Sequence, residues 1–149
     1  MRFKGFFSQL DRKFILFCTA SADQLLVYSF ALIYIWFGAL KVFGVSPVDT
    51  FVDESIGWLA FDQFSLLIGL IEVVIGVLFL FPRTLKIALI LFFLKVPGTF
   101  LPLITTPEAC FSLFPIVLTI QGQYIFKNLI LIGAAFVLYS RHGSKQPHH

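Results

Sequence analysis

Five ionisable residues lie within, or at the edge of, segments that are otherwise apolar enough to cross a membrane: Lys41, Asp62, Glu72, Lys95 and Lys127. A charged side chain at the bilayer centre costs at least ~2.5 kcal/mol on an inserted helix. Such residues are therefore kept where they pair with one another or serve the function. Their chemistry is that of ion pairing, proton transfer and binding of an anionic or electron-rich ligand.

The composition is that of a membrane protein. Of the 149 residues, 58% are hydrophobic and 13% are charged, whereas in a soluble domain about half are apolar and about a quarter are charged. At roughly 20 residues per crossing, the chain has room for four spans and no soluble domain. We predict an all-α integral membrane four-helix bundle, preceded by an amphipathic interfacial helix and followed by a polar cytoplasmic tail. The interfacial helix covers residues 1–20, the bundle 23–140 with spans at about 24–44, 58–81, 84–104 and 121–139, and the tail 141–149. A cytoplasmic cap over the bundle is the alternative role for residues 1–20.

Turn and cap residues refine these boundaries. Asp23 is predicted to cap the first span. Pro97 and Pro102 are predicted to interrupt the third span, because proline removes a backbone hydrogen bond. The second half of that span should then face protein or cavity water rather than lipid. Residues 105–120 form a long apolar loop in this scheme, which a partly re-entrant course would accommodate.

The distribution of charge predicts the orientation. Basic residues precede the first span, join the second to the third and follow the last, whereas the other two loops are acidic. By the positive-inside rule, both termini are predicted to be cytoplasmic. The basic residues are Arg2, Lys4, Arg12, Lys13, Arg83, Lys86, Arg141 and Lys145, and the acidic ones Asp49, Asp53, Glu54 and Glu108. A nucleic-acid partner is not expected, because the charge is scattered and no binding motif accompanies it.

Each predicted span has one stripe of small and polar residues that faces inward. Residues spaced three and four apart share one helix face, and glycines in such a stripe allow a neighbouring helix to approach closely. The stripes are Ala31, Tyr34, Gly38 and Lys41; Asp62, Ser65, Gly69, Glu72 and Gly76; Ala88, Phe92, Lys95, Thr99 and Pro102; and Tyr124, Lys127, Leu131 and Ala134.

Depth in the membrane indicates which charges can meet. At a rise of ~1.5 Å per residue, Lys41 and Asp62 lie about 5 Å, Lys127 about 9 Å, Lys95 about 13 Å and Glu72 about 20 Å below the outer surface. The predicted pairs are Glu72 with Lys95, and Asp62 with Lys41 or Lys127. Three lysines against two carboxylates leave one positive charge, which favours an anionic or electron-rich ligand in an outward-facing cavity.

Lys127 is predicted to be the best ligand contact, with Tyr124 and Asn128 beside it. Tyr34 is included in the same polar network, although packing is its simpler role.

Simpler explanations exist for the charges as well. Lys41 is near enough to the boundary to snorkel, and Asp62 could cap the second span. Glu72 and Lys95 could form an ion pair that only fixes the helix register.

Several kinds of catalytic site are absent from the sequence. The three histidines, His142, His148 and His149, lie outside the spans, which excludes bis-histidine haem ligation. No phosphate-binding loop, nucleophile–base pair, metal-ligand cluster or C-x-x-C motif occurs. Cys18 and Cys110 are predicted on opposite sides of the membrane. We therefore expect no catalytic residue and no metal.

Three stretches of the chain carry a likeness to a known family. They are residues 36–41 (WFGALK), residues 69–76 (GLIEVVIG) with Arg83 beyond them, and residues 122–129 (GQYIFKNL). Together they resemble the DoxX superfamily, especially its YkgB-like branch. The resemblance implies a small four-helix inner-membrane protein. Some relatives are linked to a thiosulfate:quinone oxidoreductase and others to oxidative or reactive-chlorine stress.

Three interpretations of the function follow. In the first, the chain is a redox- or stress-associated membrane subunit whose cavity holds a quinone or a small oxidised anion. Lys127 and Lys41 are then ligand contacts, Glu72 is a proton relay, and the partner is another redox subunit or a second copy. The second interpretation is a small permease or exporter, suggested by the kinked third span. The third is a non-catalytic scaffold or membrane chaperone whose charges hold the bundle together.

Overall fold

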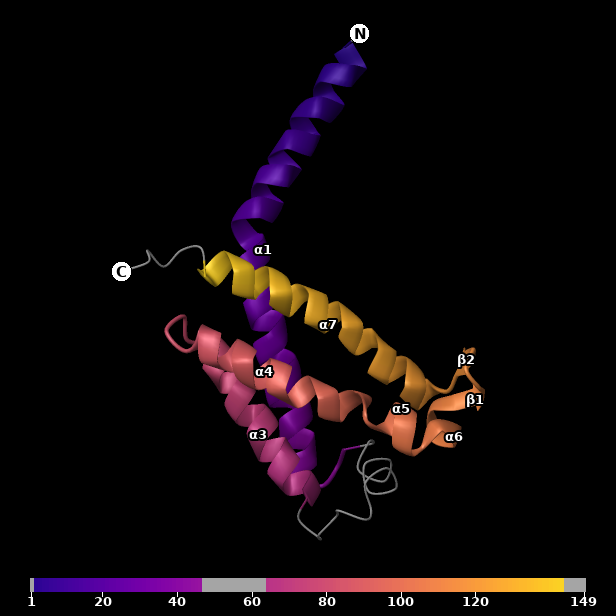
Figure 1. Cartoon of the computed structure of the whole chain (residues 1–149). Coiled ribbons are helices and arrows are strands. Elements are labelled where there is room, and N and C mark those ends of the chain that lie inside the picture. The colour runs from indigo at the N-terminus through magenta and orange to yellow at the C-terminus, as the bar shows by residue number, and fades with distance from the viewer. Residues whose placement is uncertain (1, 47–63, 144–149) are drawn as a thin grey trace.

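Helices make up most of the structure, a computed structural model that describes residues 2–46 and 64–143. Four longer helices cross one another, and a small two-stranded hairpin lies between the last two (Figure 1). The longer helices are α1 (Arg2–Val42), α3 (Phe64–Phe79), α4 (Leu85–Phe100) and α7 (Ile120–Gly143). The shorter elements are α5 (Pro102–Thr105), α6 (Pro107–Cys110), β1 (Phe111–Leu113) and β2 (Val117–Leu118).

Within the described residues, three segments are long and apolar enough to cross a membrane: Gln9–Val42, Leu85–Thr105 and Ile120–His142. This supports a membrane protein. The described part of helix α3, Phe64–Phe79, is also apolar and begins at the first residue described after position 46. The predicted start of the second span at residue 58 lies outside the described residues, as does Asp62.

Helix α1 is continuous from Arg2 to Val42, so Asp23 lies inside the helix and the predicted cap is wrong. Asp23 instead accepts a hydrogen bond from Arg141 of α7, with 2.5 Å between Oδ1 and Nη1. The helix changes direction where it passes α7 (Figure 1). Just before that point, Thr19 donates its hydroxyl to the carbonyl oxygen of Ile15 at 2.8 Å, a contact that bends helices. At 41 residues and about 60 Å, α1 is twice as long as the ~30 Å hydrocarbon core is thick.

Aromatic side chains of α1, α3 and α4 form the core. The ring of Phe30 stacks on that of Phe79, with centroids 4.9 Å apart, and meets the edge of Phe92 at 5.3 Å. All three residues are almost fully buried. They fix the three helices against one another.

Proline marks the end of α4 at the second of the two predicted positions. The helix continues through Pro97 to Phe100 and breaks at Leu101, directly before Pro102. The interruption at Pro97 is therefore wrong, and the one at Pro102 is confirmed. The tight turn between α3 and α4 is held by Thr84, whose hydroxyl donates to the carbonyl oxygen of Leu78 at 2.7 Å.

Residues 105–120 are more ordered than the predicted loop. Strands β1 and β2 pair antiparallel, with Phe111 opposite Leu118. The peptide bond between Phe114 and Pro115 is cis. Sequence patterning missed this hairpin, because its strands are only three and two residues long and show no apolar–polar alternation.

Candidate functional site

Glu72 is the one charged residue of the described part of the chain that is almost fully buried, with 4% of its surface exposed. It lies on α3 between Gly69 and Gly76, at the contact with α1. A Cβ atom on Gly69 would lie 2.8 Å from the carbonyl oxygen of Gly38, and one on Gly76 would lie 2.8 Å from the amide nitrogen of Ile35. Only glycine permits this approach, which brings α1 against the carboxylate.

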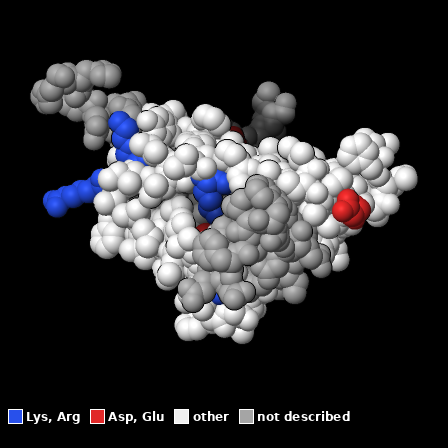
Figure 2. Space-filling model, turned by 60° about the horizontal axis from the view of Figure 1, so that its bottom comes forward, with Lys and Arg blue, Asp and Glu red and all other residues white. Residues whose placement is uncertain are grey.

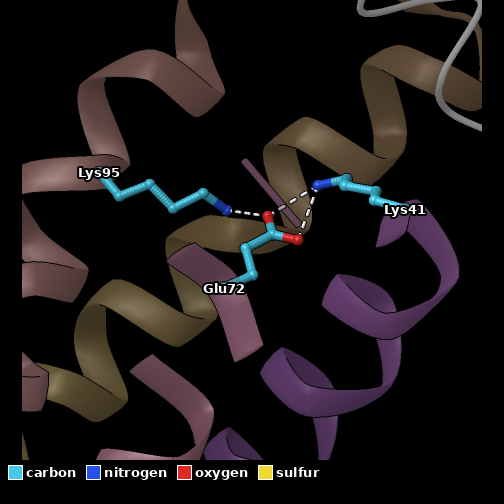
Figure 3. A network of polar contacts seen from close by, with 3 residues as sticks. All are labelled: Lys41, Glu72 and Lys95. Atoms are coloured by element: carbon cyan, nitrogen blue, oxygen red, sulfur yellow. Dashed lines mark hydrogen bonds and ion pairs between the residues drawn. The ribbon is translucent and has the colours of Figure 1, made fainter. Parts of the chain in front are cut away.

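Two lysines from neighbouring helices share this carboxylate (Figure 3). Lys41 of α1 donates from Nζ to Oε1 at 2.7 Å and to Oε2 at 2.8 Å. Lys95 of α4 donates from Nζ to Oε1. We call Lys41, Glu72 and Lys95 the triad. Two ammonium groups and one carboxylate leave one formal positive charge.

Tyr34 joins the triad to the aromatic core. Lys95 Nζ lies 5.1 Å from the centroid of the Tyr34 ring, within the range of a cation–π interaction. The same ring meets Phe92 at 5.9 Å between centroids. Tyr34 thus packs in the core, which is the simpler of the two roles considered for it, and it also contacts the triad.

The triad is not sealed from the surface. Side-chain exposure rises from 6% at Glu72 through 14% at Lys41 to 26% at Lys95. Seen from the lower end of the view in Figure 1, the surface has a hollow in which Lys or Arg atoms lie beside a small area of Asp or Glu atoms (Figure 2). The cations are therefore more accessible than the carboxylate that they share.

The predicted pairing of Glu72 with Lys95 is confirmed. Lys41 also binds Glu72, so the depth estimate that separated Lys41 from Glu72 was wrong. The other partner predicted for Lys41, Asp62, lies outside the described residues. A Cβ atom on Gly38 would lie 2.9 Å from the Cβ of Glu72, so Gly38 and Glu72 lie opposite each other where α1 and α3 meet. Lys41 lies three residues further along α1 and is then ~4.5 Å along the helix axis from Glu72, a distance that its flexible side chain covers. Counting from predicted span ends could not give this register, which the glycine contact sets.

Lys127, by contrast, does not join the triad. It is exposed on α7, and its Nζ lies 5.1 Å from the ring centroid of Tyr124, which is itself 65% exposed. Asn128 donates from Nδ2 to carbonyl oxygens of its own helix, at 2.9 Å to Tyr124 and 3.2 Å to Ile125.

The inward stripe that we predicted on the fourth span is wrong by one position. The buried residues of α7 are Gly122, Ile125, Ala135 and Leu138. The prediction assumed that a lysine must face inward. A lysine can instead snorkel along a helix surface toward the interface. The apolar spacing of Ile125, Ala135 and Leu138 was the signal that could have found the correct face. The stripes on the other three helices agree with the structure for their described residues.

Comparison of the chain with family models, curated proteins and solved structures finds no match. The likeness to the DoxX superfamily therefore rests on its three sequence stretches.

Proposed function

We propose that the protein is a four-helix, multi-pass inner-membrane protein, with both termini cytoplasmic, whose triad binds a quinone or a small anion. It would serve a redox- or stress-associated membrane system, as the DoxX likeness implies. The observation that carries the proposal is the sharing of one buried carboxylate by two lysines.

A purely structural ion pair needs one cation. The ammonium group of Lys41 already donates two hydrogen bonds to Glu72, and its positive charge neutralises the carboxylate. Adding Lys95 places a further charge among apolar residues, and desolvation makes this costly. The cost of the surplus charge is offset when an electron-rich oxygen accepts a hydrogen bond from one of the two ammonium groups. That oxygen belongs either to an anion or to a quinone carbonyl.

The exposure of the three side chains suggests a division of roles. Lys95 is the most exposed of the three, at 26%, and in this proposal its ammonium group contacts the ligand. Lys41 holds the carboxylate in place, and the ring of Tyr34 faces the ammonium group of Lys95. Glu72 is the group that could relay a proton to a bound quinone. Lys127 has no part in this site, because it lies exposed on α7.

A scaffold role is the second candidate, and one observation favours it. Every buried side-chain nitrogen or oxygen of the described residues has a hydrogen-bond partner. The triad is thus satisfied without a ligand and could serve only to hold α1, α3 and α4 in register.

Native mass spectrometry of the purified protein separates the two candidates. If the triad binds a ligand, the parent protein should retain a small molecule that Lys95→Met loses. Lys127→Met should retain it and is the matched control, because it removes the same charge from the exposed lysine. Retention by Lys95→Met, or no bound molecule in any variant, would favour the scaffold.

A further inference from the structure

The hairpin of β1 and β2 presents an unusually apolar tip. Leu113 is 64% exposed, Phe114 70% and Ile116 79%. No charged residue or histidine occurs between Glu108 and Lys127. An extramembrane turn in water is normally built from polar and turn-forming residues. This tip is therefore suited to a non-aqueous surface.

The base of the hairpin is firmly attached to α7. Thr119 donates its hydroxyl to the carbonyl oxygen of Ala109 at 2.7 Å and accepts a hydrogen bond from the amide of Gly122 at 3.2 Å. A Cβ atom on Gly122 would lie 2.1 Å from the carbonyl oxygen of Cys110, so only glycine fits there. The base is packed on one helix while the tip is left exposed.

The exposed tip continues the apolar surface of two candidate membrane-spanning segments. The hairpin connects Leu85–Thr105 to Ile120–His142 and lies at the end of α7 (Figure 1). At the adjoining ends, Ile104 is 80% and Ile120 is 70% exposed. Tyr124, with the ammonium group of Lys127 above its ring, lies about one turn further along α7. Exposed tyrosine and snorkelling lysine are typical of the membrane–water interface.

We propose that residues 111–118 lie in the headgroup–acyl boundary of the bilayer and insert the tip into lipid. The hairpin cannot go deeper, because the outer edges of its two strands carry backbone groups that hydrocarbon leaves unsatisfied. Its partner is thus a lipid surface at the ends of α4 and α7. This inference does not depend on a ligand at the triad.

Tryptophan fluorescence in nanodiscs tests the proposal. Trp36 and Trp58 are first replaced by Phe, and a single Trp is then placed at the tip by Phe114→Trp or Ile116→Trp. Glu108→Trp is the matched control, because Glu108 is exposed on α6 before the hairpin. Quenching is measured with phosphatidylcholines brominated at successive acyl-chain positions, and separately with aqueous iodide.

Both tip variants should lose most of their fluorescence to brominated lipid, most strongly with the shallowest bromines, and little to iodide. The control should show the reverse. Strong iodide quenching of the tip would overturn the proposal. So would a tip shielded from both quenchers in nanodiscs that hold two copies but not in those that hold one, since a second chain would then cover it. Using two tip positions guards against misfolding of either variant.

Discussion

Lys95 and Lys127 make the same contact in two different settings. In each, the ammonium nitrogen lies 5.1 Å from the centroid of a tyrosine ring. Lys95 is also bound to Glu72, beside the buried Tyr34, and α1 lies close by. Lys127 and Tyr124 are exposed on a single helix. The comparison teaches that a lysine in an apolar span is informative only when the opposing helix supplies a carboxylate.

The largest effect should come from removing the shared carboxylate. Glu72→Gln leaves two ammonium groups facing one another without compensation, which should cost about 3–5 kcal/mol of unfolding free energy. Thermal and chemical unfolding in detergent measure it. Glu108→Gln changes an exposed carboxylate and should shift stability by no more than about 0.5 kcal/mol. Equal small losses in both variants would show that the triad does not bear on stability.

The next effect concerns the glycine contact that brings α1 to the triad. In Gly69→Ala the new Cβ would lie 2.8 Å from the carbonyl oxygen of Gly38 and from the Cβ of Lys41, and such overpacking should cost about 1–3 kcal/mol. Gly133→Ala is the matched control on α7, because a Cβ atom there would meet no neighbouring atom within 4 Å. It should be neutral or should stabilise by up to about 1 kcal/mol. If Gly133→Ala destabilised the protein and Gly69→Ala did not, the assigned helix contacts would be wrong.

Replacing either of the two lysines should change the free energy of unfolding by less than the preceding substitutions do. Lys95→Met removes a hydrogen bond to a charged group, but it also removes the costly surplus charge and leaves Glu72 paired with Lys41, so we expect a net loss of no more than about 1 kcal/mol. Lys127→Met should stay within about 0.5 kcal/mol of the parent. Combining Lys95→Met with Glu72→Gln should recover part of the glutamine variant's loss, because only one unpaired ammonium group remains. Strict additivity would mean that Glu72 and Lys95 do not interact.

The smallest effect is on reactivity rather than stability. Cys110, the last residue of α6, is buried against Ile125 of α7. Cys18 is exposed, and both cysteines are free thiols. Burial, aided by the nearby Glu108 carboxylate, raises the pKa of the Cys110 thiol. Because the thiolate is the nucleophile, Cys110 should react more slowly than Cys18 with a neutral maleimide, and should approach its full rate only at a higher pH than an ordinary thiol. Rates are read by mass spectrometry on Cys18→Ser and Cys110→Ser. Faster labelling of Cys110 would contradict the packing of Cys110 against Ile125.

Sequence patterning predicted most of the helices because their apolar runs are long. It also placed Gly38, Gly69, Glu72 and Lys95 on contacting faces, since small and charged residues at helical spacing leave a clear pattern. It failed for features that depend on contacts between distant parts of the chain. The register that joins Lys41 to Glu72 comes from glycine packing between two helices, and the hairpin depends on short strands that leave no periodic signal.

The central claim is that the surplus positive charge of the triad binds a ligand. Its most direct test is equilibrium titration of nanodisc-embedded protein with decylubiquinone and, separately, with thiosulfate. We expect one of the two to bind the parent and Lys127→Met equally, and to bind Lys95→Met at least about tenfold more weakly, a difference of about 1.4 kcal/mol. Equal affinity of Lys95→Met and the parent for whichever probe binds, or no binding of either probe to the parent, would contradict the claim.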